Sequence, residues 1–84
     1  MFTLDPKLEA DSIPVAVSGE VEIRLMRDGR YFWVLMIPQR PGLVEWHDMD
    51  DGLAVYLTRL SRFLGQAVQT ATSCAKINTA AIGN

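Results

Sequence analysis

The stretch that decides the fold is residues 21–37, which read Val-Glu-Ile-Arg-Leu-Met-Arg-Asp-Gly-Arg-Tyr-Phe-Trp-Val-Leu-Met-Ile. Val21–Leu25 alternates apolar and charged residues, which is the period of a strand with one buried face. Asp28–Gly29 can supply the positive φ angles of a tight hairpin turn. Tyr31–Ile37 is apolar at every position, which is typical of a central strand covered on both faces. The stretch therefore predicts an antiparallel hairpin with Trp33 in the core.

A long amphipathic helix follows the hairpin. Asp48 suits the N-cap position, and Asp51 lies three residues on as its box-like partner. Trp46 just before them suits a hydrophobic staple or, as the alternative, a half-exposed position at a partner surface. The run Thr70–Ser73 lowers helix propensity and predicts the end of the helix. Apolar residues recur between these limits at spacings of three and four, which predicts one face packed on a sheet. These residues are Leu53, Leu57, Leu60, Leu64, Ala67 and Ala71.

Shorter elements complete the pattern at both ends of the chain. Leu4–Ala10 predicts a short helix, with Asp5 as its cap and Pro6 at the first helical position, where no N–H is needed. Val15–Val17 predicts a brief extended stretch, and Lys76–Ile82 predicts a strand of small residues. The sequence as a whole predicts an α+β fold. We expect an antiparallel sheet, one long amphipathic helix and a short N-terminal helix in a single domain over residues 1–84.

Composition limits the classes of function. Nearly half of the 84 residues, 49%, are hydrophobic, so the chain is globular rather than disordered. The net charge of −2 arises from mixed acidic and basic residues, and no basic face predicts binding to nucleic acid or anionic lipid. The longest apolar run, Tyr31–Ile37, is too short to span a bilayer. A single cysteine, Cys74, fits a reducing cytoplasm.

No residue pattern predicts a metal site or a catalytic group. His47 lies among acidic residues, and Asp48–Asp50 begins like a calcium loop. However, Leu53 stands where such a loop needs its turn glycine and Arg59 where it needs a bidentate glutamate. One histidine and one distant cysteine are too few ligands for zinc. Cys74 has no neighbouring base, so we interpret it as a small packed residue at a helix end. The sequence predicts no cofactor.

Three segments together resemble the histidine triad (HIT) superfamily of nucleotide hydrolases and transferases. They are the strand Tyr31–Ile37, the loop Arg40–Gly42, and the run Lys76–Asn84, which ends in Asn-Thr-Ala-Ala-Ile-Gly-Asn. In that family a similar run leads into a strand carrying His-x-His-x-His, where one histidine attacks phosphorus. The sequence stops before such a strand, and its one histidine, His47, lies far upstream. The resemblance therefore implies about the first three fifths of a HIT domain, without catalytic residues.

The resemblance also implies positions for nucleotide binding. Arg27 and Asp28 occupy the place where the family contacts the ribose hydroxyls, although Asp28 is equally well explained as a turn residue. Asn78 falls on an asparagine that approaches the phosphate side, and Asn84 on the polar residue before the triad strand. These four residues form the predicted nucleotide site.

The implied function is hydrolysis or transfer at a nucleoside phosphate through a histidine nucleophile, with this chain inactive alone. We expect weak nucleotide binding. We also expect a homodimer, because Lys76–Ile82 would leave one uncharged sheet edge without its neighbour. The alternative is a non-catalytic remnant of the HIT fold that serves as a small dimeric binding or interaction module.

Overall fold

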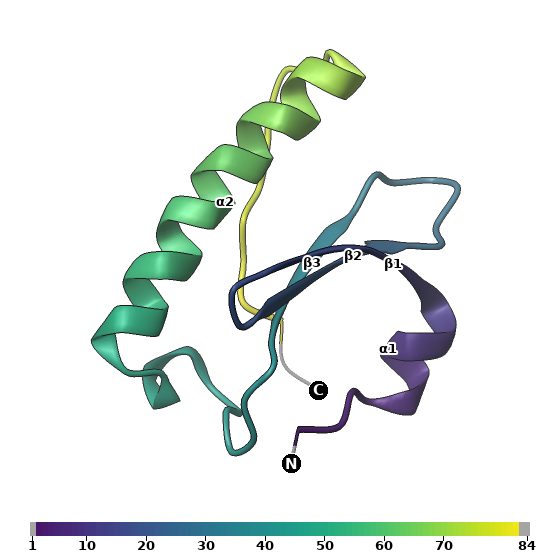
Figure 1. Cartoon of the computed structure of the whole chain (residues 1–84). Helices are drawn as coiled ribbons and strands as arrows, with labels where there is room; N and C mark the ends of the chain where they lie inside the picture. Colours follow the sequence, from purple (N-terminus) through teal and green to yellow (C-terminus); the bar gives the residue numbers. More distant parts are fainter. Residues whose placement is uncertain (1, 83–84) are drawn as a thin grey trace. The chain divides into compact units, whose positions relative to one another are not determined.

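The computed structural model describes residues 2–82 and shows an α+β protein (Figure 1). It forms two compact units, Met1–Pro41 and Gly42–Asn84, and each is described here by itself. The first unit holds a short helix and a three-stranded sheet, and the second holds a 3₁₀ turn and a long helix. The elements are α1 (Pro6–Asp11), β1 (Ser12–Ser18), β2 (Val21–Met26), β3 (Val34–Pro38), η1 (Trp46–Asp48) and α2 (Asp51–Thr72). The predicted fold class is confirmed.

The sheet is antiparallel, and β2 lies between β1 and β3. The tight turn joins β1 to β2, where Ser18 pairs with Val21 and Gly19 adopts a φ of 58°. Glycine suits this position because a left-handed backbone is strained for residues that carry a Cβ. The prediction of a tight turn at Asp28–Gly29 is wrong, since among the described glycines only Gly19 and Gly42 have positive φ.

A seven-residue loop, residues 27–33, connects β2 to β3 in place of that turn. The backbone N–H of Met26 donates to the Trp33 carbonyl over 3.1 Å and closes the base of the loop. The return strand is therefore Val34–Pro38 rather than Tyr31–Ile37, and it lies at an edge of the described sheet rather than in the middle. Trp33 is 39% exposed, so its predicted place in the core is wrong.

The first strand is longer than its sequence indicates. The predicted extended stretch Val15–Val17 is part of β1, which covers seven residues and contains an irregularity in register between Pro14 and Ala16. Proline has no N–H to donate to a ladder, so it occurs at edge strands and bulges. Both conditions hold here, because β1 is an edge strand.

Apart from Ser12 at the start of β1, the buried side chains of the sheet lie on β2. Val21 and Ile23 are buried, as their alternation predicts, but Arg24 between them is also buried, at 5% exposure. Its Nε donates to the Ser12 hydroxyl over 2.7 Å, and its Nη2 donates to the carbonyls of Ser12 and Glu9 over 3.0 and 3.3 Å. Its Nη1 pairs with Glu22 over 2.9 Å. Arg24 therefore ties the end of α1 to the middle of the sheet.

The short helix α1 begins as predicted. The Asp5 carboxylate accepts a hydrogen bond from the Lys7 N–H over 2.8 Å, and Pro6 is the first helical residue. This arrangement satisfies one of the N–H groups that a helix start leaves without a partner.

The long helix α2 begins two residues after the predicted position. Its cap is Asp50, whose carboxylate accepts from the Leu53 N–H over 2.8 Å. The predicted cap, Asp48, instead accepts from the N–H groups of Val44 and Glu45 over 3.1 and 2.9 Å and ends the short η1 turn. Trp46 lies in η1 and is 52% exposed, so its predicted staple role is wrong.

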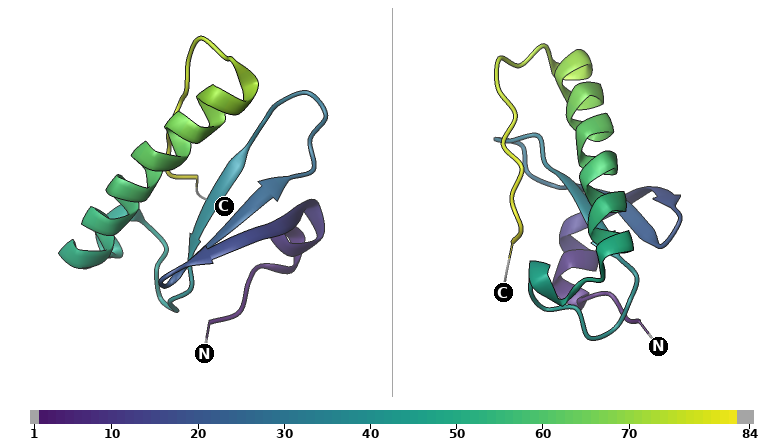
Figure 2. Two further views of the ribbon diagram at one scale, coloured as in Figure 1. Left: turned by 45° about the horizontal axis from the view of Figure 1, so that its top comes forward. Right: turned by 90° about the vertical axis from the view of Figure 1, so that its left-hand side faces the viewer.

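The end of α2 lies where the sequence predicts it, whereas the segment after it differs from the prediction. The helix ends at Thr72, and Ser73 takes a left-handed conformation with its N–H bonded to the Gln69 carbonyl over 2.8 Å. Residues 76–82 are assigned no strand, so that prediction is wrong. The segment instead runs back along α2 within its unit (Figure 2), and a Cβ built on Gly65 would lie 3.8 Å from Ile77.

Candidate nucleotide-binding site

Two of the four predicted site residues, Arg27 and Asp28, lie at the start of the β2–β3 loop. The backbone N–H of Arg27 donates to the carbonyl of Asp11 over 2.8 Å, which fixes the first loop residue to the end of α1. With the Met26–Trp33 bond, this anchors the loop to the sheet unit at its base. The local backbone that presents Asp28 is therefore tied to regular structure on both sides.

The Asp28 carboxylate organises the loop. Its Oδ1 accepts from the backbone N–H of Arg30 over 2.9 Å and from the Arg30 Nε over 3.4 Å, and its side chain is 20% exposed. This is the side-chain-to-backbone pattern of an aspartate-centred turn. A carboxylate offers about four acceptor positions, so these bonds leave capacity for a ligand hydroxyl. The turn role of Asp28 is observed, and its ribose role stays a prediction.

The last three residues of the loop are aromatic. The sequence pattern did not predict them here, because it placed them in the strand Tyr31–Ile37. Tyr31, Phe32 and Trp33 are 63%, 55% and 39% exposed. The Arg30 guanidinium carbon lies 5.7 Å from the centre of the Tyr31 ring, within the range of a cation–π contact. The loop thus combines a carboxylate, two arginines and three exposed rings within seven residues. The sequence feature that could have indicated this longer loop is the run Asp28–Arg30, whose polar residues precede the apolar strand.

The other two predicted residues are distant from this loop in the sequence. Asn78 belongs to the exposed segment after α2, in the second unit. Asn84 lies outside the described residues. The structure thus brings Arg27 and Asp28 together and describes Asn78 separately from them. Arg40, in the loop that the resemblance cites, lies at the other end of the sheet, where it pairs with Glu20 over 2.8 Å.

The acidic segment before α2 has structural partners. Hydrogen bonds from the backbone N–H groups of Glu45 and Val44, with a smaller effect of the His47 charge, hold the pKa of the Asp48 carboxyl below its ordinary value. Among residues 2–82, no group of three or more His, Cys, Asp and Glu side chains is placed to hold a metal ion. Cys74 is half-buried just after α2, and its carbonyl accepts from Gln69 over 3.3 Å.

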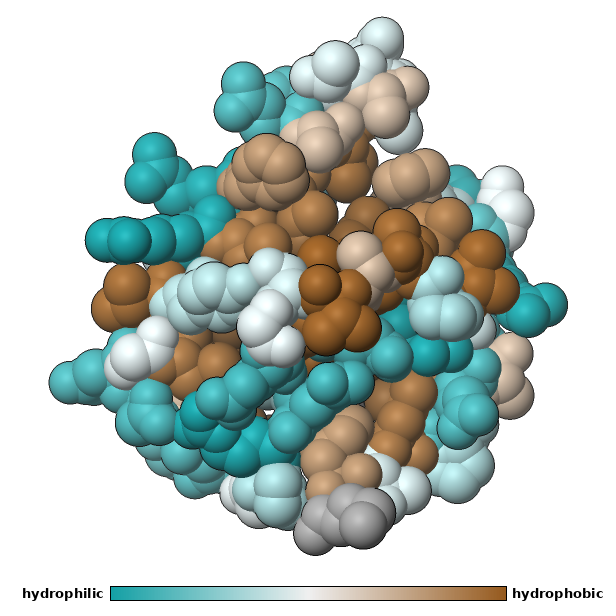
Figure 3. Space-filling view, viewed as in Figure 1, coloured by the Kyte–Doolittle hydropathy of each residue, from teal (hydrophilic) through white to brown (hydrophobic). Residues whose placement is uncertain are grey.

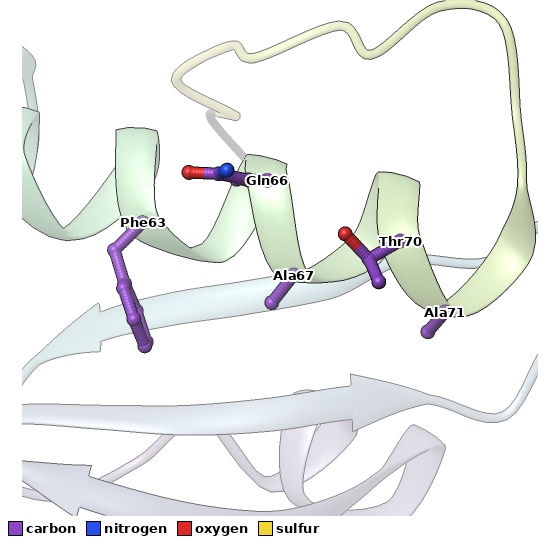
Figure 4. Close-up of a pocket in the computed structure, with 5 residues that line it drawn as sticks. All are labelled: Phe63, Gln66, Ala67, Thr70 and Ala71. Carbon is purple, nitrogen blue, oxygen red and sulfur yellow. The ribbon is translucent and has the colours of Figure 1, made fainter.

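The second unit has a shallow hollow on the surface of α2. Figure 4 shows its lining residues, which project from the second half of the helix. They are Phe63, Gln66, Ala67, Thr70 and Ala71. None of them is titratable or a metal ligand, so the hollow is an apolar surface rather than a catalytic site.

Comparison with solved structures shows that the chain is similar in fold to histidine triad proteins. It matches a histidine triad (HIT) protein of Sinorhizobium meliloti with a TM-score of 0.93 and 36% sequence identity. It matches a histidine triad protein of Bradyrhizobium japonicum with a TM-score of 0.93 and 30% identity. Each match covers 99% of this chain and 62% of the other chain, so the chain spans less than two thirds of either relative. The resemblance is confirmed: the chain has the fold of histidine triad proteins.

Two other comparisons found no match. No protein-family model matches the sequence, and the search of curated proteins found no relative. Within the described residues, no helix is both long and apolar enough to cross a membrane.

Proposed function

We propose that this chain carries the base- and ribose-binding part of a HIT-type domain that hydrolyses or transfers nucleoside phosphates. The observation that carries the proposal is the match to two HIT proteins over 99% of the chain at 36% and 30% identity. The anchored loop with Arg27 and Asp28 supports it, because it presents a carboxylate beside two cations. We place the protein in the cytoplasm, in keeping with its single cysteine.

The proposed contacts come from two stretches of the sequence. Asp28 accepts hydrogen bonds from the ribose hydroxyls, and Arg27 lies beside it as a positive charge for an anionic ligand. Asn78 approaches the phosphate side, and Asn84 belongs to the same end of the site. Because the phosphate contacts depend on these later residues and on a triad strand, we expect weak affinity that gains little from additional phosphates.

The proposed chemistry requires a histidine nucleophile that other histidines orient. The one histidine, His47, lies in η1 rather than on a strand, and no second histidine is present to orient it. A histidine nucleophile needs neighbours that position it and protonate the leaving group. We therefore expect no turnover of a dinucleoside polyphosphate or a nucleoside phosphoramidate. Activity that survives His47→Ala in purified protein would contradict this expectation.

The binding proposal is tested by calorimetric titration with adenosine and guanosine monophosphate. Loss of a charge-assisted hydrogen bond costs about 1.5–3 kcal/mol, so Asp28→Ala should weaken binding roughly tenfold or more. Asp28→Asn keeps an acceptor for the Arg30 N–H and should weaken binding less. If Asp28→Ala and Asp28→Asn change the affinity equally, and also change the thermal stability equally, Asp28 acts in the turn alone.

A second candidate function, a non-catalytic dimeric interaction module, is favoured by the apolar surface of α2. Phe63 is 69% exposed on this helix, and Ala67 and Ala71 lie at helical spacing from it. Apolar side chains reach the surface in the space-filling view (Figure 3). We propose that a second copy covers the Phe63 surface, since the strand predicted to mediate a dimer is absent from residues 76–82.

Sedimentation at micromolar concentration tests the dimer. We expect a dimer for the unchanged chain and a monomer for Phe63→Glu, which places a charge in the proposed interface. Arg62→Glu is the matched control, because Arg62 is exposed and polar on the same helix. A folded monomer at all concentrations would contradict the interaction module.

A further inference from the structure

The short helix α1 is held on the sheet by polar contacts. It is six residues long and none of its residues is buried, so apolar packing contributes little to its position. The last carbonyls of a helix have no partners within it. In α1 the carbonyls of Leu8, Glu9 and Asp11 accept hydrogen bonds from groups that follow the helix in the chain. The position of α1 therefore depends on these bonds.

Arg24 supplies most of the bonds that fix the end of α1. Its side chain comes from β2 and is 7% exposed. Its Nε donates to the Ser12 hydroxyl over 2.7 Å, and that hydroxyl donates in turn to the Leu8 carbonyl. Its Nη2 donates to the carbonyls of Glu9 and Ser12 over 3.3 and 3.0 Å. A planar guanidinium can direct donors to several acceptors at once, so this one side chain fastens α1 to β2.

The end of α1 in turn holds the first residue of the β2–β3 loop. The carbonyl of Asp11, the last residue of α1, accepts from the Arg27 N–H over 2.8 Å. Asp28 follows directly, and its carboxylate accepts from the Arg30 N–H over 2.9 Å. A chain of contacts therefore runs from the Arg24 guanidinium through the end of α1 to the residue that carries the proposed ribose contact.

Within the nucleotide-binding function proposed above, on which this step rests, we propose that Arg24 is a positioning residue that sets the place of the Asp28 carboxylate through α1. Arg24 does not act on the ligand itself. Its guanidinium is buried, its donors are engaged by Ser12 and Glu9, and its charge is paired with Glu22 over 2.9 Å. A carboxylate that is held in place before the ligand arrives lowers the entropic cost of binding.

Arg24→Lys tests this role, because lysine keeps the charge but lacks the planar fork that reaches several acceptors. Hydrogen exchange of the ligand-free protein should show faster exchange at the Arg27 and Arg30 amides, whose acceptors are then held less firmly. The affinity of the folded protein for adenosine monophosphate, followed by amide chemical shifts, should fall roughly three- to tenfold. Ser12→Ala removes only the hydroxyl between Arg24 and the Leu8 carbonyl, and it should give the same changes to a smaller extent if Arg24→Lys does not fold.

Val21→Ala is the matched control for a general loss of stability. Val21 is buried on the same strand, beside the β1–β2 turn and away from the β2–β3 loop. Its truncation should lower the thermal midpoint while the affinity of the folded protein stays within about twofold. Exchange at the Arg27 amide should then follow the overall stability instead of rising on its own.

A double-mutant cycle with Asp28→Ala decides whether Arg24 acts through Asp28. Positioning predicts that Arg24→Lys weakens adenosine monophosphate in the unchanged chain and adds no further loss in the Asp28→Ala background. Equal losses in both backgrounds would overturn the proposal. So would a lower thermal midpoint with unchanged affinity of the folded protein, because Arg24 would then stabilise the fold alone.

The ligand-free exchange separates this proposal from the nucleotide function. If adenosine monophosphate does not bind the unchanged chain at millimolar concentration, the nucleotide function fails. Faster exchange at the Arg27 and Arg30 amides in Arg24→Lys, beyond that of Val21→Ala, would still show that Arg24 sets the place of the loop. Exchange that is the same in the two variants would overturn the positioning role.

Discussion

The first unit, Met1–Pro41, is called the sheet unit here, and the second, Gly42–Asn84, the helix unit. Each is stabilised by its own internal contacts, and the residues in contact are farther apart in the sequence in the sheet unit than in the helix unit. In the sheet unit, Arg24 donates to the carbonyl of Glu9, fifteen residues earlier in the chain. In the helix unit, the capping bonds of α2 join residues three to five positions apart, such as Asp50 with Leu53 and Gln69 with Cys74. Contacts of short range can be identified from a local sequence pattern, whereas contacts of long range depend on which segments meet.

The largest expected effect comes from the long-range contact. Arg24→Ala removes the donors that satisfy the Ser12 hydroxyl and the carbonyls of Ser12 and Glu9, and it leaves Glu22 without its cation. Removing one member of a buried charged network lowers the free energy of unfolding by about 2–4 kcal/mol. Urea denaturation measures this change.

Arg59→Ala is the matched control for Arg24→Ala, because Arg59 is exposed on α2. We expect its effect to stay within about 0.5 kcal/mol, as for ordinary surface substitutions. Equal effects of the two variants would show that the buried guanidinium does not stabilise the sheet unit.

Two glycines distinguish the observed turn from the predicted one. Gly19 has a φ of 58°, so Gly19→Ala should destabilise the protein by about 1–2 kcal/mol, the strain of a left-handed alanine. Gly29 lacks positive φ, and a Cβ built on it meets nothing within 4 Å. Gly29→Ala should therefore be neutral or slightly stabilising. Thermal unfolding of both variants measures the difference. A larger destabilisation by Gly29→Ala than by Gly19→Ala would support the predicted tight turn at Asp28–Gly29.

Two aspartates test the start of α2 in the same way. Asp50→Ala removes the acceptor of the Leu53 N–H and should cost about 1 kcal/mol, with a loss of helical circular dichroism. Asp48→Ala removes the acceptor for Val44 and Glu45 outside the helix and should leave the helical signal unchanged. A greater loss of helix for Asp48→Ala would place the cap where the sequence predicts it.

The smallest expected effect is the titration of Asp48. Backbone hydrogen bonds from Glu45 and Val44 hold the pKa of this carboxyl below 3.8 in the folded chain. A lowered folded-state pKa gives stability that is present above the unfolded-state pKa and is lost as pH falls through the folded-state pKa. Carbon-13 NMR of the carboxyl should show a lower midpoint in the folded chain than in urea. Equal midpoints would show that the η1 hydrogen bonds do not favour the ionised form.

These contrasts show which parts of the fold could be predicted from the sequence. The α2 helix was predictable, because leucines at helical spacing and an acidic start are local signals, although the choice between Asp48 and Asp50 as cap was not. The alternation of Val21–Leu25 located β2 but placed Arg24 with the polar residues, since alternation cannot show that α1 covers the second face. For Lys76–Ile82, small uncharged residues favour extended backbone, and a strand forms only where another segment pairs with it.

The candidate site was predictable in part for the same reason. Arg27 and Asp28 were located through the resemblance, because they follow a strand that the pattern identifies well. The exposed rings of Tyr31 and Trp33 were not, because an apolar run does not show which of its residues enter the ladder. The register of β3 on β2 decides this, and it pairs Val34 with Leu25 and leaves the three aromatic residues in the loop.

The most direct test is a titration of the nitrogen-15-labelled 84-residue chain with adenosine monophosphate, followed by amide chemical shifts. The sheet unit carries the proposed base and ribose contacts, so we predict shift changes concentrated in residues 27–33, with small changes along α2. Absence of any change at millimolar ligand, or changes confined to residues 51–72, would contradict a nucleotide site in the β2–β3 loop.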